Sequence, residues 1–127
     1  MKKCLFLLFC VALLFASCSD NYKAKKILTE AAETVNNDAP LQVDYMTTLT
    51  SCNFDGQNFN YYYEVNEDYT SDIREFEEEM RENLQNLWDT DPVFDEIKDN
   101  LRKVNGSVIY NYVGDESGEK MTIHVKI

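Results

Sequence analysis

The chain has 127 residues, of which 12 are basic and 23 are acidic, so its net charge at pH 7 is −11. This balance disfavours nucleic acid as a partner, because binding to a phosphate backbone requires clustered lysines and arginines. The length accommodates one domain with one hydrophobic core.

Residues 1–17 have the layout of a secretory signal peptide. Lys2 and Lys3 precede an unbroken apolar run from Leu5 to Ala16, which Ala16-Ser17 closes. The run is much shorter than the roughly 20 residues that a helix needs to cross a bilayer. We therefore expect this segment to be cleaved during export.

The segment Phe15-Ala16-Ser17-Cys18 resembles the lipobox of bacterial lipoproteins. The resemblance implies that Cys18 receives acyl chains such as palmitate, becomes the first residue of the mature chain and anchors it durably, since two membrane signals suffice for stable attachment. Ser19-Asp20-Asn21 resembles the start of mature lipoproteins from the Bacteroidota, which favours the outer membrane. The lysines that follow Asp20 leave the leaflet open, either periplasmic or surface.

Cysteine usage argues against a disulfide framework. Cys4 and Cys10 leave with the signal peptide and Cys18 carries the lipid, so Cys52 alone remains. An ordinary secretory cleavage would instead leave Cys18 as an unpaired thiol in an oxidising compartment, which is unfavourable. The mature chain would have 10 basic and 23 acidic residues, a net charge of −13.

Residues 18–40 contain a modest helical stripe. Ile27, Ala31 and Val35 recur at i, i+4 and i+8, and the segment from Asn36 to Pro40 ends the pattern. The sequence leaves open whether this helix docks on the domain or remains a tether.

Residues 41–127 are expected to form a single α+β domain that opens with a β-hairpin. Apolar and aromatic residues alternate over 41–49 and again over 59–65, on either side of "FDGQN". The length of the turn sets the register, and a slip of one residue turns every side chain to the other face.

Two loop lengths compete in this hairpin. A two-residue Asp55-Gly56 loop would pair Cys52 with Phe59 and would put the apolar sets of the two strands on different faces. A three-residue loop pairs Leu49 with Tyr63 and keeps both apolar sets on one face. We therefore predict the three-residue loop, which places Cys52 on the outer face together with Asn60, Tyr62 and Glu64.

Two amphipathic helices are predicted next, over 70–88 and 92–104. Asp72-x-x-Glu75 fits a capping box for the first helix. Asp91 caps the second helix, with Pro92 at its first position, and Asn105-Gly106 stops it. The apolar stripe of the first helix comprises Ile73, Phe76, Met80, Leu84 and Leu87.

Two more alternating segments, 108–112 and 121–127, follow with a polar connection between them. The predicted fold is therefore a small antiparallel four-stranded sheet made of two hairpins. Two central helices pack on one face of the sheet, and an N-terminal helix or tether precedes the domain.

Catalytic chemistry is not indicated by any motif. His124 alternates with apolar neighbours on the last strand and points away from the core, and nothing places Cys52 beside it as a nucleophile. The acidic segment Asp89–Asp99 lacks a calcium-loop pattern, because Val93 and Phe94 stand where an oxygen ligand and a glycine are needed. We expect no enzyme, no metal and no cofactor.

Two surfaces are candidates for binding. Residues 64–99 hold 14 acids against three bases, and Glu75, Glu78, Glu79 and Glu82 lie off the apolar stripe of their helix. These acids either form a solvated face or steer a cationic protein towards the chain. Tyr62 and Asn60 on the outer sheet face could hold a sugar or peptide, although tyrosine is common in strands for packing reasons alone.

Two functions follow from these surfaces. The first is a membrane-anchored, non-enzymatic binding protein, of inhibitor or immunity type, whose acidic surface meets a cationic protein. The alternative is a cell-envelope module that holds a glycan or peptide on an aromatic sheet face.

Overall fold

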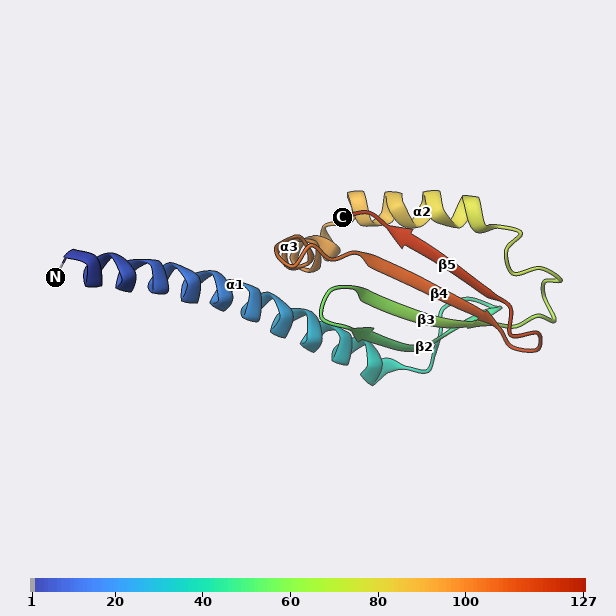
Figure 1. Cartoon of the computed structure of the whole chain (residues 1–127). Coiled ribbons are helices and arrows are strands. Elements are labelled where there is room, and N and C mark those ends of the chain that lie inside the picture. The colour runs from blue at the N-terminus through green and yellow to red at the C-terminus, as the bar shows by residue number, and fades with distance from the viewer. Residues whose placement is uncertain (1) are drawn as a thin grey trace.

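The structure is a computed structural model that describes the backbone of residues 2–127 and the side chains of residues 20–127. An N-terminal helix leads into a five-stranded sheet whose third and fourth strands are separated by a helical segment (Figure 1). The elements are α1 (Lys2–Asp38), β1 (Leu41–Gln42), β2 (Thr47–Phe54), β3 (Phe59–Val65), α2 (Glu77–Thr90), η1 (Pro92–Phe94), α3 (Asp95–Lys103), β4 (Val108–Gly114) and β5 (Lys120–Val125).

The sheet is mixed, with the strand order β1-β2-β3-β4-β5. Neighbouring strands are antiparallel except β3 and β4, which are parallel. The helical segment α2-η1-α3 returns the chain to the end of the sheet where β3 began, and such a crossover makes the flanking strands parallel. The α+β class is confirmed, whereas the predicted four-stranded antiparallel sheet is wrong in its strand number and in this pairing.

The predicted strand over 41–49 is interrupted. Only Leu41 and Gln42 pair with β2, opposite Leu49 and Thr48. The Asp44 Oδ1 atom accepts hydrogen bonds from the backbone N–H groups of Met46 at 2.9 Å and Thr47 at 2.8 Å. An aspartate that binds the backbone two and three residues ahead forms a turn, which bends the chain between β1 and β2.

The turn between β2 and β3 has four residues rather than the predicted three. Phe54 pairs with Phe59, while the predicted pair of Leu49 with Tyr63 is present. A β-bulge between Leu49 and Ser51 reconciles these two pairings, because one extra residue in β2 shifts the register. The bulge also reverses the facing of the following residues, so Cys52 is buried and its predicted position on the outer face is wrong.

The helix α2 begins later than predicted. The Asp72 Oδ1 atom accepts from the Arg74 backbone N–H at 2.9 Å, and α2 starts only at Glu77 without a side-chain cap. The capping box at Asp72 is therefore wrong, and Phe76, which was expected in the core, is 45% exposed. The start of the next helical segment is confirmed, because the Asp91 side chain accepts from the Val93 backbone N–H and Pro92 follows it.

Directly after α3, the backbone passes very close to the turn between β2 and β3. Asn105 has a φ of 54°, so it takes the left-handed conformation that often ends a helix. At the next position, a Cβ atom on Gly106 would lie 2.0 Å from the Gln57 carbonyl oxygen and 2.8 Å from Leu101 Cδ2. The Asn105-Gly106 stop predicted from the sequence is confirmed, and glycine is needed at its second position for space.

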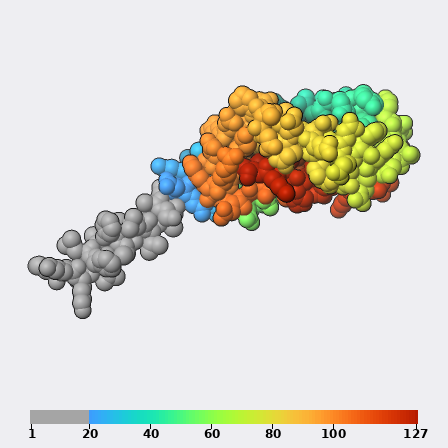
Figure 2. Space-filling view, turned by 90° about the horizontal axis from the view of Figure 1, so that it is seen from above, coloured from blue at the N-terminus to red at the C-terminus, as the bar shows by residue number. Residues whose placement is uncertain are grey.

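All three helices pack on one face of the sheet. Leu28 and Ala32 of α1, Trp88 of α2 and Leu101 of α3 belong to the same buried core as the inward residues of the strands. The helix α1 lies beside β2 and α3 (Figure 1), and α2 lies along β5 (Figures 1 and 2). The described part of α1 therefore docks on the domain. None of the helices described here combines the length and hydropathy that crossing a membrane requires.

Candidate binding surfaces

Four tyrosines form a stacked ladder on the helix-facing side of the sheet. The parallel register sets Tyr61 beside Tyr110 and Tyr63 beside Tyr112, and the ring centroids of these pairs lie 4.8 Å and 5.0 Å apart. The Trp88 Nε1 atom donates to the Tyr110 hydroxyl at 2.7 Å. Burial raises the pKa of Tyr110 to about 12 and also raises the pKa values of the other three phenols.

A largely apolar groove of about 350 Å³ lies over this ladder, between α2 and the β1–β2 connection. The ladder forms one wall, and Met80, Leu84 and Leu87 of α2 contribute the opposite one. Val43 and Leu87 at the groove are 49% and 40% exposed. The sequence pattern had assigned both residues to packed stripes, because periodicity shows which residues share a face but not whether that face is fully covered.

The acidic candidates occupy the surface of α2 and the turn before it. Glu78, Glu79 and Glu82 lie on α2, Glu75 lies in the preceding turn, and all four side chains are exposed, as predicted. Glu78 forms an ion pair with Arg81 at 2.8 Å. In the part of the chain whose side chains are described, the other three form no ion pair.

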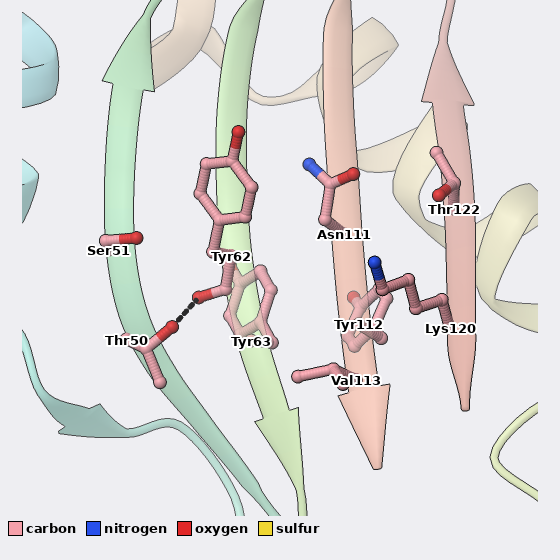
Figure 3. Close-up of a pocket in the computed structure, with 9 residues that line it drawn as sticks. All are labelled: Thr50, Ser51, Tyr62, Tyr63, Asn111, Tyr112, Val113, Lys120 and Thr122. Carbon is pink, nitrogen blue, oxygen red and sulfur yellow. Dashed lines mark hydrogen bonds between the residues drawn. The ribbon is translucent and has the colours of Figure 1, made fainter. Parts of the chain in front are cut away.

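On the opposite face of the sheet no described helix packs, and this face contains a shallow hollow of about 370 Å³. In Figure 3 the side chains of Tyr62, Asn111 and Thr122 rise from β3, β4 and β5, and Lys120 borders the hollow. The Thr50 hydroxyl donates to the Tyr62 carbonyl at 3.1 Å. The lining includes hydroxyls, the Asn111 amide, the Tyr62 ring and the Lys120 cation, a set suited to a polar ligand.

Asn60 lies on the same sheet face as Tyr62, as predicted, but its side chain is not part of the hollow. It is buried, and its Nδ2 atom donates to Asn53 Oδ1 at 3.0 Å and to Asp55 Oδ2 at 3.1 Å. Desolvation raises the pKa of Asp55, but bonds from the Asn58 and Gln57 N–H groups and from Asn60 outweigh it and lower that pKa below its ordinary value. Asn60 thus holds the β2–β3 turn, and the hollow does not include it.

No nucleophilic pair is assembled by Cys52 and His124. Cys52 is 1% exposed in the core, and desolvation raises the pKa of its thiol to about 12. His124 is exposed on β5 and faces away from the core, as predicted. Within the residues the structure describes, no group of three or more His, Cys, Asp or Glu side chains is placed to hold a metal ion.

The predicted lipidation residue, Cys18, lies outside the residues whose side chains are described. The described side chains of α1 begin two positions later, at Asp20. Lipidation therefore remains a prediction from the sequence.

The described chain is an α+β domain with a mixed sheet and two hollowed surfaces that are candidates for binding. No family model matches its sequence, and no curated protein matches it. Solved structures nevertheless share its fold.

A candidate secreted protein from Pseudomonas aeruginosa superposes with a TM-score of 0.69 at 10% identity, covering 84% of this chain and 92% of that one. The pilotin EpsS of the Vibrio vulnificus type 2 secretion system gives 0.66 at 9% identity, covering 85% and 92%. The type II secretion system pilotin AspS of Vibrio cholerae gives 0.57 at 12% identity, covering 85% and 94%. At these identities the likeness establishes the fold alone.

Proposed function

We propose that this chain is a lipid-anchored, non-enzymatic protein of the cell envelope, and that it binds a partner protein in the groove between α2 and the β1–β2 connection. The observation that carries the proposal is the groove itself, whose apolar wall residues remain partly exposed. Contiguous exposed apolar surface bordered by polar residues is typical of interaction sites. A bound apolar segment would cover this surface and remove it from water.

Two further observations support an envelope role. The first is the resemblance of the segment ending at Cys18 to a lipobox. The second is the shared fold with two pilotins of type II secretion systems. The outer membrane is the proposed compartment, and the leaflet stays open.

The charge around the groove defines the partner's chemistry. Asp44 belongs to the lining, Glu79 precedes Met80 on α2, and the α2 surface is acidic. Such a field attracts cationic proteins and speeds their association. The partner would therefore present apolar side chains flanked by lysine or arginine, and an inhibitor or immunity role towards a cationic protein is one form of this activity.

The groove is tested by changing one wall residue. In cells that make the protein natively, a tagged Leu87→Asp chain should lose a partner that co-purifies with the unchanged chain, because a charge would be buried in the interface. Thr122→Asp on the opposite sheet face is the matched control and should retain the partner. If both variants, each shown to be folded by thermal unfolding, recover equal amounts of the partner, the groove is not its binding site.

The anchor is tested separately. Detergent phase partitioning should retain the chain in the detergent phase after expression in a bacterium that processes lipoproteins, and a Cys18→Ser chain should move to the aqueous phase. If both chains partition alike, Cys18 is not the anchor.

The hollow on the helix-free sheet face favours a second candidate function, the binding of a glycan. Tyr62 offers a ring for stacking, while Thr122, Asn111 and Thr50 offer hydrogen-bonding groups. Retention on immobilised envelope glycans should then be insensitive to salt and should fall with Tyr62→Ala. Binding that disappears at moderate salt would indicate simple charge attraction instead.

A further inference from the structure

We infer that the end of the molecule formed by the first described turns of α1 lies against an anionic lipid surface, with Lys23, Lys25 and Lys26 contacting the headgroups. The inference rests on the proposed lipid anchor at Cys18 and deepens it, because it states how the anchored domain is held. The partner is a membrane surface of anionic phospholipid.

Very few residues separate the anchor from the domain. Only Ser19 separates Cys18 from Asp20, the first residue of α1 whose side chain is described. Ala24 is already 0% exposed, packed within the domain. A helix rises 1.5 Å per residue, so Asp20 and Ala24 are about 6 Å apart along its axis. A lipid on Cys18 would therefore hold this end of the domain beside the headgroups, without room for a flexible tether.

The exposed side chains of these turns also suit a lipid surface. Lys23, Lys25 and Lys26 are exposed, and among the residues with described side chains none of them forms an ion pair. Tyr22 beside them is 69% exposed. Lysine and tyrosine both suit the boundary between hydrocarbon and water, because each combines an apolar stem or ring with a polar end.

Charge is distributed unevenly between the two ends of the molecule. The connection between β3 and α2 holds Glu67, Asp68, Asp72 and Glu75 against the single base Arg74. Figure 1 places this connection at the end of the sheet remote from the start of α1. An anionic surface repels the acidic end and attracts the lysines, so both terms favour one orientation.

The neighbour of these turns does not oppose this orientation. The helix α3 packs against α1 and lies at the same end of the sheet (Figure 1). Its charges balance, with three acids and three bases: Asp95, Glu96, Asp99, Lys98, Arg102 and Lys103. Within the first turns of α1 the three lysines outnumber the one acid, Asp20, so these turns present a net positive charge to the membrane.

The test couples the chain beginning at Cys18, which retains every residue whose side chain is described, to a maleimide lipid through the Cys18 thiol. Cys52 is buried and should not compete for the maleimide. The vesicles contain phosphatidylcholine alone or phosphatidylcholine with phosphatidylglycerol. Acetylation of individual lysines by a water-soluble reagent is followed by mass spectrometry, with Lys120 at the remote end of the sheet as internal control.

On the vesicles with phosphatidylglycerol, acetylation of Lys23, Lys25 and Lys26 should slow by about fivefold, the factor expected for one lysine held near an anionic surface. Lys120 should react at an unchanged rate, and added salt should restore the rates of the other three. Equal rates on both kinds of vesicle, or equal slowing at Lys120, would overturn the inference. Because the coupling replaces cellular lipidation, the outcome is independent of whether Cys18 is processed in the cell.

Discussion

At the scale of single residues, two side-chain amides each bind one edge of the sheet. The Asn36 Oδ1 atom accepts from the Cys52 N–H at 2.7 Å, and its Nδ2 atom donates to the Cys52 carbonyl. At the other edge, Gln85 donates to the Lys126 carbonyl at 2.8 Å and accepts from its N–H at 2.9 Å. Each amide takes the place of a neighbouring strand residue by bonding one backbone N–H and one carbonyl of the sheet edge. These groups are then not free to pair with another chain at that point.

We predict that Asn36→Ala lowers the free energy of unfolding by about 1–3 kcal/mol, because two hydrogen bonds of roughly 0.5–1.5 kcal/mol each are lost. Asn37→Ala is the control, since the Asn37 side chain is exposed and should change stability by less than about 0.5 kcal/mol. Urea unfolding measures both. Similar values for the two variants would show that the Asn36 amide does not stabilise the edge of β2.

The Cys52 thiol should resist alkylation until the chain unfolds. It is buried and its pKa is raised to about 12, so both access and thiolate content are low at pH 8. In a Cys18→Ser chain, iodoacetamide should label Cys52 only after denaturant is added. Thr50→Cys in a Cys52→Ser background is the control and should react quickly, because Thr50 is exposed.

The error about Cys52 has a definite physical cause. Alternation in the sequence predicted the correct pair of Leu49 with Tyr63, but it could not reveal the bulge beyond Leu49, because a bulge inserts a residue without a composition signal. Asn60 was likewise placed on the correct side of the sheet, while its role in the turn depends on contacts with Asn53 and Asp55.

At the scale of elements, the tyrosine ladder should make the fold sensitive to alkali. Below a pH of about 10, folded and unfolded chains both retain the phenol protons, so the stability contribution is fully present. Burial raises the pKa of Tyr110 from 10.0 to about 12 and raises the pKa values of Tyr61, Tyr63 and Tyr112. As the pH rises above 10, the unfolded chain ionises first and the contribution is lost.

Each such tyrosine should lower the free energy of unfolding by at most about 1.4 kcal/mol per pH unit in this range. Urea unfolding measured from pH 9 to 12 should show the decline, to which Cys52 adds from a pH of about 9.0. In a Tyr112→Phe chain the free energy of unfolding should fall less steeply with pH, by the contribution of one tyrosine. An unchanged slope would mean that Tyr112 titrates normally in the folded chain.

The acidic surface makes a separate prediction. Replacing Glu75, Glu78, Glu79 and Glu82 by glutamine should slow association with a cationic partner and reduce its salt dependence, because exposed charges act mainly on the association rate. Stability should change little, since all four side chains are exposed and only Glu78 among them forms an ion pair. If the glutamine variant and the unchanged chain associate at the same rate at both low and physiological salt, these acids are only a solvated face.

The pairing of elements was harder to predict than the elements themselves. Alternation of apolar residues predicted β3, β4 and β5, over 59–65, 108–112 and 121–127. Apolar residues at helical spacing predicted α2 and α3. The parallel contact of β3 with β4 depends on where the helical crossover returns the chain, and alternation within a strand carries no information about its neighbour. The ladder of four tyrosines exists only because of that contact.

At the scale of the whole molecule, the two sides of the sheet have different roles. One side holds the core and the groove, and the other side carries the polar hollow. The sequence predicted a one-sided core correctly, because apolar residues alternate with polar ones in the strands. The groove could not be predicted, since it results from the gap that α2 leaves beside the β1–β2 connection.

The central claim is that a partner protein occupies this groove. The most direct measurement is photo-crosslinking in cells that make the protein natively, with a photoreactive amino acid at Leu87 in one chain and at Thr122 in the other. We predict one discrete cross-linked protein from Leu87, absent from Thr122 and lost when Val43 on the opposite side of the groove is changed to glutamate. Cross-linking from Thr122 but not from Leu87 would contradict the claim and place binding on the helix-free face of the sheet.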